Sequence, residues 1–99
     1  MAEYALTNRA AQDLTEIYHF SVQRFGARVA ETYLNSLDLR FSQLAEQPKL
    51  GRRVPHFRPG YFRNMCLRHA IFYTQTSDGI LVVRVLHQRM DFSRHLWDE

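Results

Sequence analysis

The stretch that decides the fold is SDGILVVRVLH, Ser77 to His87. Its Asp-Gly pair tolerates the positive φ angles of a tight hairpin turn, so one strand should end before it and another should begin after it. In the strand that follows, side chains alternate between the two sides of a sheet. One side would carry Leu81, Val83, Val85 and His87, and the other would carry Ile80, Val82, Arg84 and Leu86. Both sides are apolar, which predicts a strand that is covered on both faces.

The turn belongs to a predicted meander of three strands, at about Tyr61–Leu67, His69–Thr74 and Ile80–His87. The segment before the meander, Gln47–Gly60, contains all three prolines and two of the four glycines of the chain. We therefore predict an irregular loop there. A further short alternating strand, EYALT, lies at residues 3–7.

Between the first strand and the loop, the pattern changes to a helical period. From Asn8 one apolar stripe includes Ala10, Leu14, Ile17, Tyr18, Ser21, Val22 and Phe25. Thr7 or Asn8 can cap this helix, and Gly26 suits its end. A second helix is predicted from about Ala27 to Glu46. With about two residues between them, the two helices must form an antiparallel hairpin.

The predicted order is β-α-α-β-β-β, an α+β fold in which the helix hairpin packs on a small, mainly antiparallel sheet. We expect one domain, residues 1–99, with a short C-terminal tail, DFSRHLW, that forms one helical turn begun by Asp91. The helix pair can cover only one face of the sheet. The tail could cover the other face, but we favour a partner chain, because an apolar patch left in water usually marks an interface.

The charges are divided unevenly along the chain. Residues 1–48 contain four arginines against six acids, whereas residues 49–99 contain nine basic residues against four acids. No carboxylate lies between Gln47 and Ser77, where Lys49 and five arginines fall. This block favours a docking surface for an anionic partner. The single cysteine, the short apolar runs and an N-terminal stretch without a signal-peptide pattern predict a cytoplasmic protein that does not enter a membrane.

A catalytic site is harder to assemble. A small ribonuclease needs a base, an acid and cations for the phosphate. Arginines 63, 68, 84 and 89 could supply the charge, and His69 or His87 could supply one proton carrier. The first two strands of the meander carry no carboxylate, and Gln88 follows His87, so the second proton carrier is missing. We predict no catalytic residues and keep a ribonuclease as the alternative.

Metal and direct nucleic-acid binding are weaker possibilities. His87, Asp91 and His95 are spaced by four, but His87 ends a strand, so the three do not share a helix face. We predict no metal site and no cofactor, and a core position for the lone Cys66. Aromatic side chains in the basic block could stack on bases, although they suit loop anchors better. DNA contact is expected only indirectly, through a partner.

Four stretches resemble ParE-type toxins of the RelE/ParE toxin–antitoxin superfamily, in the same order and at the same spacing. They are YALTNRAAQDLTEIYHF, AEQPKLGRRV, RPGYFRNMCLRHAIFY and ILVVRVLHQRMDFSRHL. In the last stretch, Arg84, His87 and Asp91 match the pattern R-x-L-H-x-x-x-D, which also includes Arg89. The resemblance covers almost the whole chain.

The resemblance implies a toxin held in a hetero-oligomer by a ParD-like antitoxin. Relatives with this pattern act on DNA gyrase by binding, while ribonuclease relatives cleave mRNA on the ribosome. The missing proton carriers favour the gyrase branch; the alternatives are a RelE-like mRNA endonuclease and a non-toxic module that co-represses its operon with the antitoxin. The candidate contacts with antitoxin or target are Arg58, Arg63, Arg84, His87 and Arg89.

Overall fold

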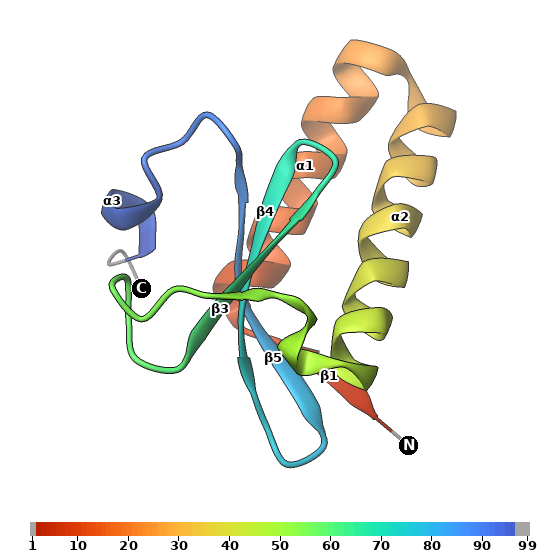
Figure 1. Ribbon diagram of the computed structural model, residues 1–99. Helices are drawn as coiled ribbons and strands as arrows, with labels where there is room; N and C mark the ends of the chain where they lie inside the picture. The colour runs from red at the N-terminus through yellow and green to blue at the C-terminus, as the bar shows by residue number, and fades with distance from the viewer. Residues whose placement is uncertain (1, 97–99) are drawn as a thin grey trace.

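The computed structural model describes residues 2–96, and Figure 1 shows their arrangement. A helix hairpin packs against one sheet of five strands, and a short helix follows the last strand. The elements are β1 (Glu3–Leu6), α1 (Asn8–Phe25), α2 (Ala27–Glu46), the 3₁₀ turn η1 (Pro48–Leu50), β2 (Arg52–Arg53), β3 (Tyr61–Cys66), β4 (His69–Gln75), β5 (Gly79–His87) and α3 (Phe92–Leu96). The predicted α+β fold and its element order are confirmed.

The strands lie in the order β1-β5-β4-β3-β2. Strands β3, β4 and β5 form the predicted antiparallel meander, and β1 pairs in parallel with β5, so the sheet is mixed. The predicted irregular loop is wrong in one respect, because Arg52 and Arg53 form a two-residue edge strand beside β3. Tyr73 organises this segment: its hydroxyl accepts the Gly51 N–H at 2.9 Å and donates to the Pro48 carbonyl at 2.7 Å.

The helix hairpin turns on one residue, not two. Gly26 adopts φ 90°, and its N–H donates to the Val22 carbonyl at 2.9 Å, which ends α1 just before α2 begins. At the other end of α1, the Thr7 hydroxyl accepts the Ala10 N–H at 3.0 Å, which confirms Thr7 as the cap. The predicted stripe is wrong at Phe25, which is 55% exposed at the end of the hairpin.

The predicted alternation along β5 is wrong in its second half. The register with β4 shifts between Phe72 and Tyr73, so that Phe72 faces Arg84 while Tyr73 faces Val82. This bulge places an extra residue in β5 and reverses the sides beyond it. Val85 therefore joins Ile80 and Val82 in the core under the helices, while Val83 packs in the core on the opposite face with Leu86.

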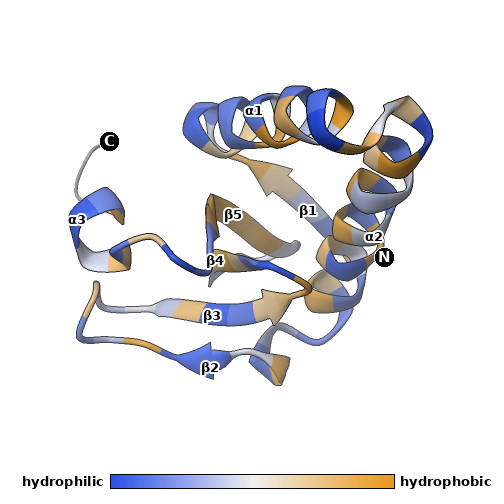
Figure 2. Ribbon diagram, turned by 90° about the horizontal axis from the view of Figure 1, so that it is seen from above, coloured by the Kyte–Doolittle hydropathy of each residue, from blue (hydrophilic) through white to orange (hydrophobic). Residues whose placement is uncertain are grey.

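The second face of the sheet is covered by the chain itself. Here Phe72, Val83 and Leu86 pack with Leu96 of α3 and with Val54 from the loop after β2, and all five are nearly inaccessible to water. Figure 2 shows α3 on the side of the sheet opposite α2. A partner chain is therefore not needed to cover this face, and that expectation is wrong; the tail, the other possibility, covers it. Trp97, the last residue of the predicted tail, lies outside the described residues.

Cys66 is buried in the core under the helices, as predicted. Across residues 2–96, each helix falls short of the length or the apolar character that crossing a membrane requires.

Candidate partner-binding surfaces

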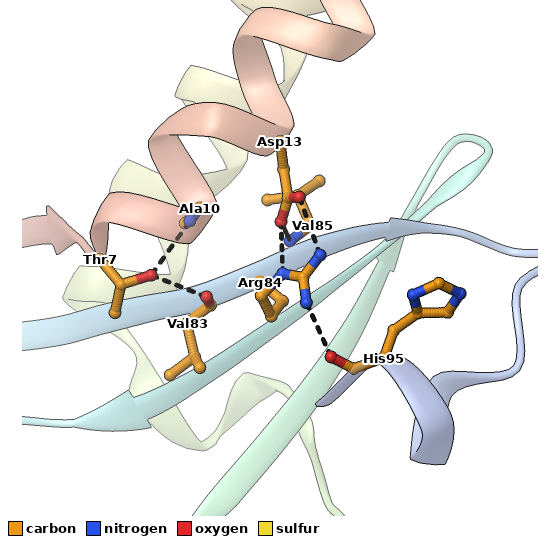
Figure 3. A network of polar contacts seen from close by, with 7 residues as sticks. All are labelled: Thr7, Ala10, Asp13, Val83, Arg84, Val85 and His95. Atoms are coloured by element: carbon orange, nitrogen blue, oxygen red, sulfur yellow. Dashed lines mark hydrogen bonds and ion pairs between the residues drawn. The ribbon is translucent and has the colours of Figure 1, made fainter. Parts of the chain in front are cut away.

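Beyond the end of β1, the side chains of Thr7, the cap of α1, and of Asp13 in α1 take over the pairing of β5. Strand β1 reaches only to Val82, which leaves the outer edge of β5 without a neighbouring strand. The Thr7 hydroxyl donates to the Val83 carbonyl at 2.8 Å, and the Asp13 carboxylate accepts the Val85 N–H at 3.0 Å (Figure 3). These bonds satisfy backbone groups that would otherwise be buried without partners.

The same carboxylate holds Arg84, one of the predicted contact residues. Arg84 is 3% exposed, and its Nε and Nη2 atoms donate to the two oxygens of Asp13 at 2.8 and 3.0 Å. Its Nη1 donates to the His95 carbonyl of α3 at 2.7 Å (Figure 3). Arg84 therefore has almost no surface in this fold to offer a partner, and its predicted contact with one stays a prediction. Arg84 joins α1, β5 and α3 inside the chain.

Asp13 is the functional side chain that the sequence interpretation missed. It is a buried carboxylate on the face of α1 that packs on β5. A charged residue three positions after Ala10 and four before Ile17, on the predicted core-facing stripe, indicates such a buried pair. This position on the stripe is the signal in the sequence that points to Asp13.

His87 lies at the end of β5, directly opposite His69 of β4. The two rings meet edge to face, with centroids 5.3 Å apart. Tyr33 of α2 completes the cluster: its hydroxyl accepts the Arg68 N–H at 3.1 Å and lies 2.6 Å from Nδ1 of His69. Because the Tyr33 hydroxyl has one hydrogen and two lone pairs, it can pair with either neutral form of His69, and the direction of this bond depends on which ring nitrogen carries the hydrogen.

The environment keeps His69 uncharged at neutral pH. Burial lowers the pKa of His69 from 6.5 to about 4, and repulsion from His87 adds to this, while Asp13 opposes it. With Nδ1 bonded to Tyr33 and the ring edge against His87, the two imidazoles leave no space between them for a phosphate. The nearby carboxylate of Asp13 is occupied by Arg84. This arrangement does not suit the acid–base pair of a ribonuclease.

The other candidate residues fall in two places. Arg58 lies in the loop before β3 and Arg63 lies on β3; both are half-buried, and the Arg63 guanidinium lies 5.8 Å from the centre of the Phe92 ring of α3. Arg89 is exposed beyond β5, and its N–H donates to Nδ1 of His87 at 3.1 Å. The structure therefore pairs Arg89 with His87, while the Arg63 guanidinium lies against α3.

Part of the basic block forms the edge of the sheet. Arg52 and Arg53 are exposed on β2, and the Arg53 guanidinium lies 5.8 Å from the centre of the Phe62 ring. Beside it is an open depression of about 470 Å³, walled by Arg53, Pro55, Pro59 and Phe62. Within residues 2–96, no three His, Cys, Asp or Glu side chains gather as metal ligands.

Several large apolar side chains are exposed on or next to three connecting segments of the fold. The α1–α2 turn, the β3–β4 turn and the segment after β5 all lie at the upper end in Figure 1. These three segments and their flanks carry Phe20, Phe25, Val29, Met65, Leu67 and Met90, each between 41% and 62% exposed. The apolar side chains at the end of the helix hairpin and those at the β3–β4 turn are two candidate contact surfaces.

Comparison with known proteins identifies the family. A family model described as the ParE toxin of the type II toxin–antitoxin system parDE matches residues 4–92. The chain belongs to the ParE toxin family. The resemblance that the sequence motifs indicated is therefore confirmed over nearly the whole chain.

Individual relatives of this ParE family member agree. Toxin ParE1 of Mycobacterium tuberculosis is 40% identical over 96 residues, covering 96% of this chain and 98% of the relative. Toxin ParE1 of Caulobacter vibrioides is 35% identical, with 97% and 99% covered. A solved structure of the chromosomal ParDE system from Pseudomonas aeruginosa superposes with a TM-score of 0.75 over 88% of this chain and 96% of that one, at 20% identity, and supports the fold.

Proposed function

We propose that this ParE-family toxin arrests growth by binding DNA gyrase without catalysing a reaction, and that a ParD-like antitoxin neutralises it in the cytoplasm. The observation that carries the proposal is the family match over residues 4–92. The contact between His69 and His87 supports binding over RNA cleavage, since the two rings cannot bracket a phosphate.

The surface offers two kinds of contact for these partners. Apolar side chains on the helix hairpin, Phe20, Phe25 and Val29, can be buried by a folding antitoxin segment. Arg58, Arg63, His87 and Arg89 are the candidates for contacts with acidic groups of antitoxin or gyrase. Arg84 is left out of this set because it is buried against Asp13.

Two parallel reactions test the proposal. Purified toxin is added to a gyrase supercoiling reaction and to a coupled translation reaction with transcript mapping, each with and without antitoxin. We expect inhibited supercoiling, intact transcripts and restoration by antitoxin. Cleaved transcripts with normal supercoiling, together with loss of the cleavage in His87→Ala, would establish the endonuclease alternative. Neither effect, together with operator binding only alongside antitoxin, would establish the co-repressing module.

A further inference from the structure

The two-residue turn between β3 and β4 holds a leucine in an unusual backbone conformation. Cys66 pairs with His69 across the turn, which leaves Leu67 and Arg68 as its central residues. Leu67 has φ 57°, and among residues 2–96 no other residue except glycine has a positive φ. Turns of this length with a positive φ at the first central position usually place glycine there. A leucine in this conformation is strained, and such strain is often found at functional positions.

Three hydrogen bonds from two neighbouring segments fix this turn. Arg40 of α2 donates to the Met65 carbonyl at 2.9 Å, and Tyr33 of α2 accepts the Arg68 N–H at 3.1 Å. From the segment after β5, the Gln88 N–H donates to the Arg68 carbonyl at 2.9 Å. The surrounding structure thus holds the turn in place before any partner binds, which lowers the entropic cost of binding.

The fixed turn presents its leucine to solvent. Leu67 is 62% exposed, more than the other exposed large apolar side chains, and Met65 beside it is 41% exposed. Arg68 is exposed at the same tip, and Gln88 brings the exposed Arg89 close to the turn. The tip is therefore an apolar projection flanked by guanidinium groups, in a part of the sequence without carboxylates.

We propose that this tip, formed by Met65, Leu67 and Arg68, inserts into an apolar pocket rimmed by carboxylates on the folded target of the toxin. Shape distinguishes the target from the antitoxin. A short segment that folds on the toxin fills concave or flat surfaces, whereas a projecting leucine needs a preformed pocket, which a large folded enzyme can provide. The inference rests on the proposed function for the identity of that enzyme, gyrase.

Two variants of Leu67 and one matched control test this site. Leu67→Gly and Leu67→Asn remove the apolar side chain with residues that tolerate positive φ, so the melting temperature should stay the same or rise. Leu39→Ala removes another leucine, 60% exposed on α2. For the full chain, we would measure how strongly the protein inhibits DNA supercoiling by gyrase, whether it arrests growth when induced without antitoxin, and how tightly it binds the antitoxin.

We expect both Leu67 variants to need at least tenfold more protein for inhibition and to lose growth arrest, with antitoxin affinity within twofold of wild type and Leu39→Ala unchanged. Inhibition and arrest at wild-type levels would overturn the proposal, as would loss of antitoxin affinity alone. If wild-type protein arrests growth without inhibiting gyrase, the proposed function is wrong. In that case, loss of growth arrest in the Leu67 variants would still support insertion of the tip into another target, and growth arrest in these variants would refute it. A wild-type chain that does neither refutes both.

Discussion

The two faces of the sheet are closed by very different amounts of structure. On one face, two long helices cover the sheet, and Leu37, Phe41 and Leu44 of α2 are buried against the strands. On the opposite face, the five-residue α3 contributes a single fully buried side chain, Leu96, and the half-buried Phe92. The hairpin face thus supplies most of the core. The second face depends on the few contacts of α3, and one of these is the Arg84 guanidinium, which Asp13 on the hairpin side holds.

Arg84 connects the two faces. Its guanidinium is bound to Asp13 on the hairpin side and to the His95 carbonyl of α3 on the other. Arg84 directly follows the bulge at Val83, beyond which the side chains of β5 exchange sides. The difference between the faces can therefore be tested by removing the Asp13–Arg84 pair, by truncating a buried side chain on each face, and by changing a charged or titratable group on each face.

Removing Asp13 should have the largest effect. Asp13→Ala leaves Arg84 buried without its carboxylate and the Val85 N–H without an acceptor. Breaking a buried pair on one side costs about 3–5 kcal/mol of unfolding free energy. Urea unfolding followed by circular dichroism would measure it.

The matched control for this change is the double variant Asp13→Leu with Arg84→Met. It replaces both charges by apolar groups of similar size, so the loss should be clearly smaller than for Asp13→Ala. An equal loss in the two proteins would mean that the orphaned charge is not the cause, and that packing or the lost acceptor of the Val85 N–H is.

Truncating the apolar anchor of each face should give the next effect. We expect Leu96→Ala to cost about 2 kcal/mol, the low end for a buried leucine, because the short α3 can detach while the rest stays folded. Leu37→Ala should cost more and should destabilise the whole domain. Amide hydrogen exchange distinguishes the two: faster exchange confined to α3 and its contacts for Leu96→Ala, and faster exchange throughout for Leu37→Ala. Uniform loss of protection in Leu96→Ala would show that the faces unfold together.

Acid should weaken the hairpin face through His69. The folded chain excludes a proton that the unfolded chain binds between pH 6.5 and about 4, because the pKa of His69 is lowered to about 4 in the fold. The contribution of His69 to the unfolding free energy is therefore fully present above pH 6.5 and is lost as the pH falls toward about 4. The loss is about 1–2 kcal/mol once solvent screening of this partly exposed group is considered. His69→Gln should flatten the unfolding free energy over this range, whereas His19→Gln, at an exposed position, should not. A wild-type slope in His69→Gln would assign the acid sensitivity to other groups.

The fold could be predicted from the sequence because its periodicity is clear: the helix stripes, Gly26 and the Asp-Gly turn set the helices and the meander. The bulge could not, since nothing in ILVVRVLH marks where an extra residue enters β5. The sides of Val85 and Leu86 were therefore wrong, while Val83 lies opposite Ile80 and Val82 as predicted, and the burial of Arg84 was missed. A buried arginine and an exposed one look alike in sequence unless its partner is recognised, and here the partner, Asp13, lies on another element. Whether the candidate contact residues bind a partner stays a prediction.

Arg63 gives the smallest effect on stability and separates a structural role from a binding role. Its guanidinium contacts the ring of Phe92 at a half-exposed position, so Arg63→Ala should cost only about 0.5–1 kcal/mol of unfolding free energy. If Arg63 pairs with a carboxylate of the antitoxin, the same change should weaken that complex by about 2–5 kcal/mol, as titration calorimetry would show. Arg63→Lys keeps the charge but loses the planar fork, and should give an intermediate affinity. If Arg63→Ala lowers the free energy of antitoxin binding by no more than it lowers the free energy of unfolding, Arg63 serves only to hold α3 against the sheet.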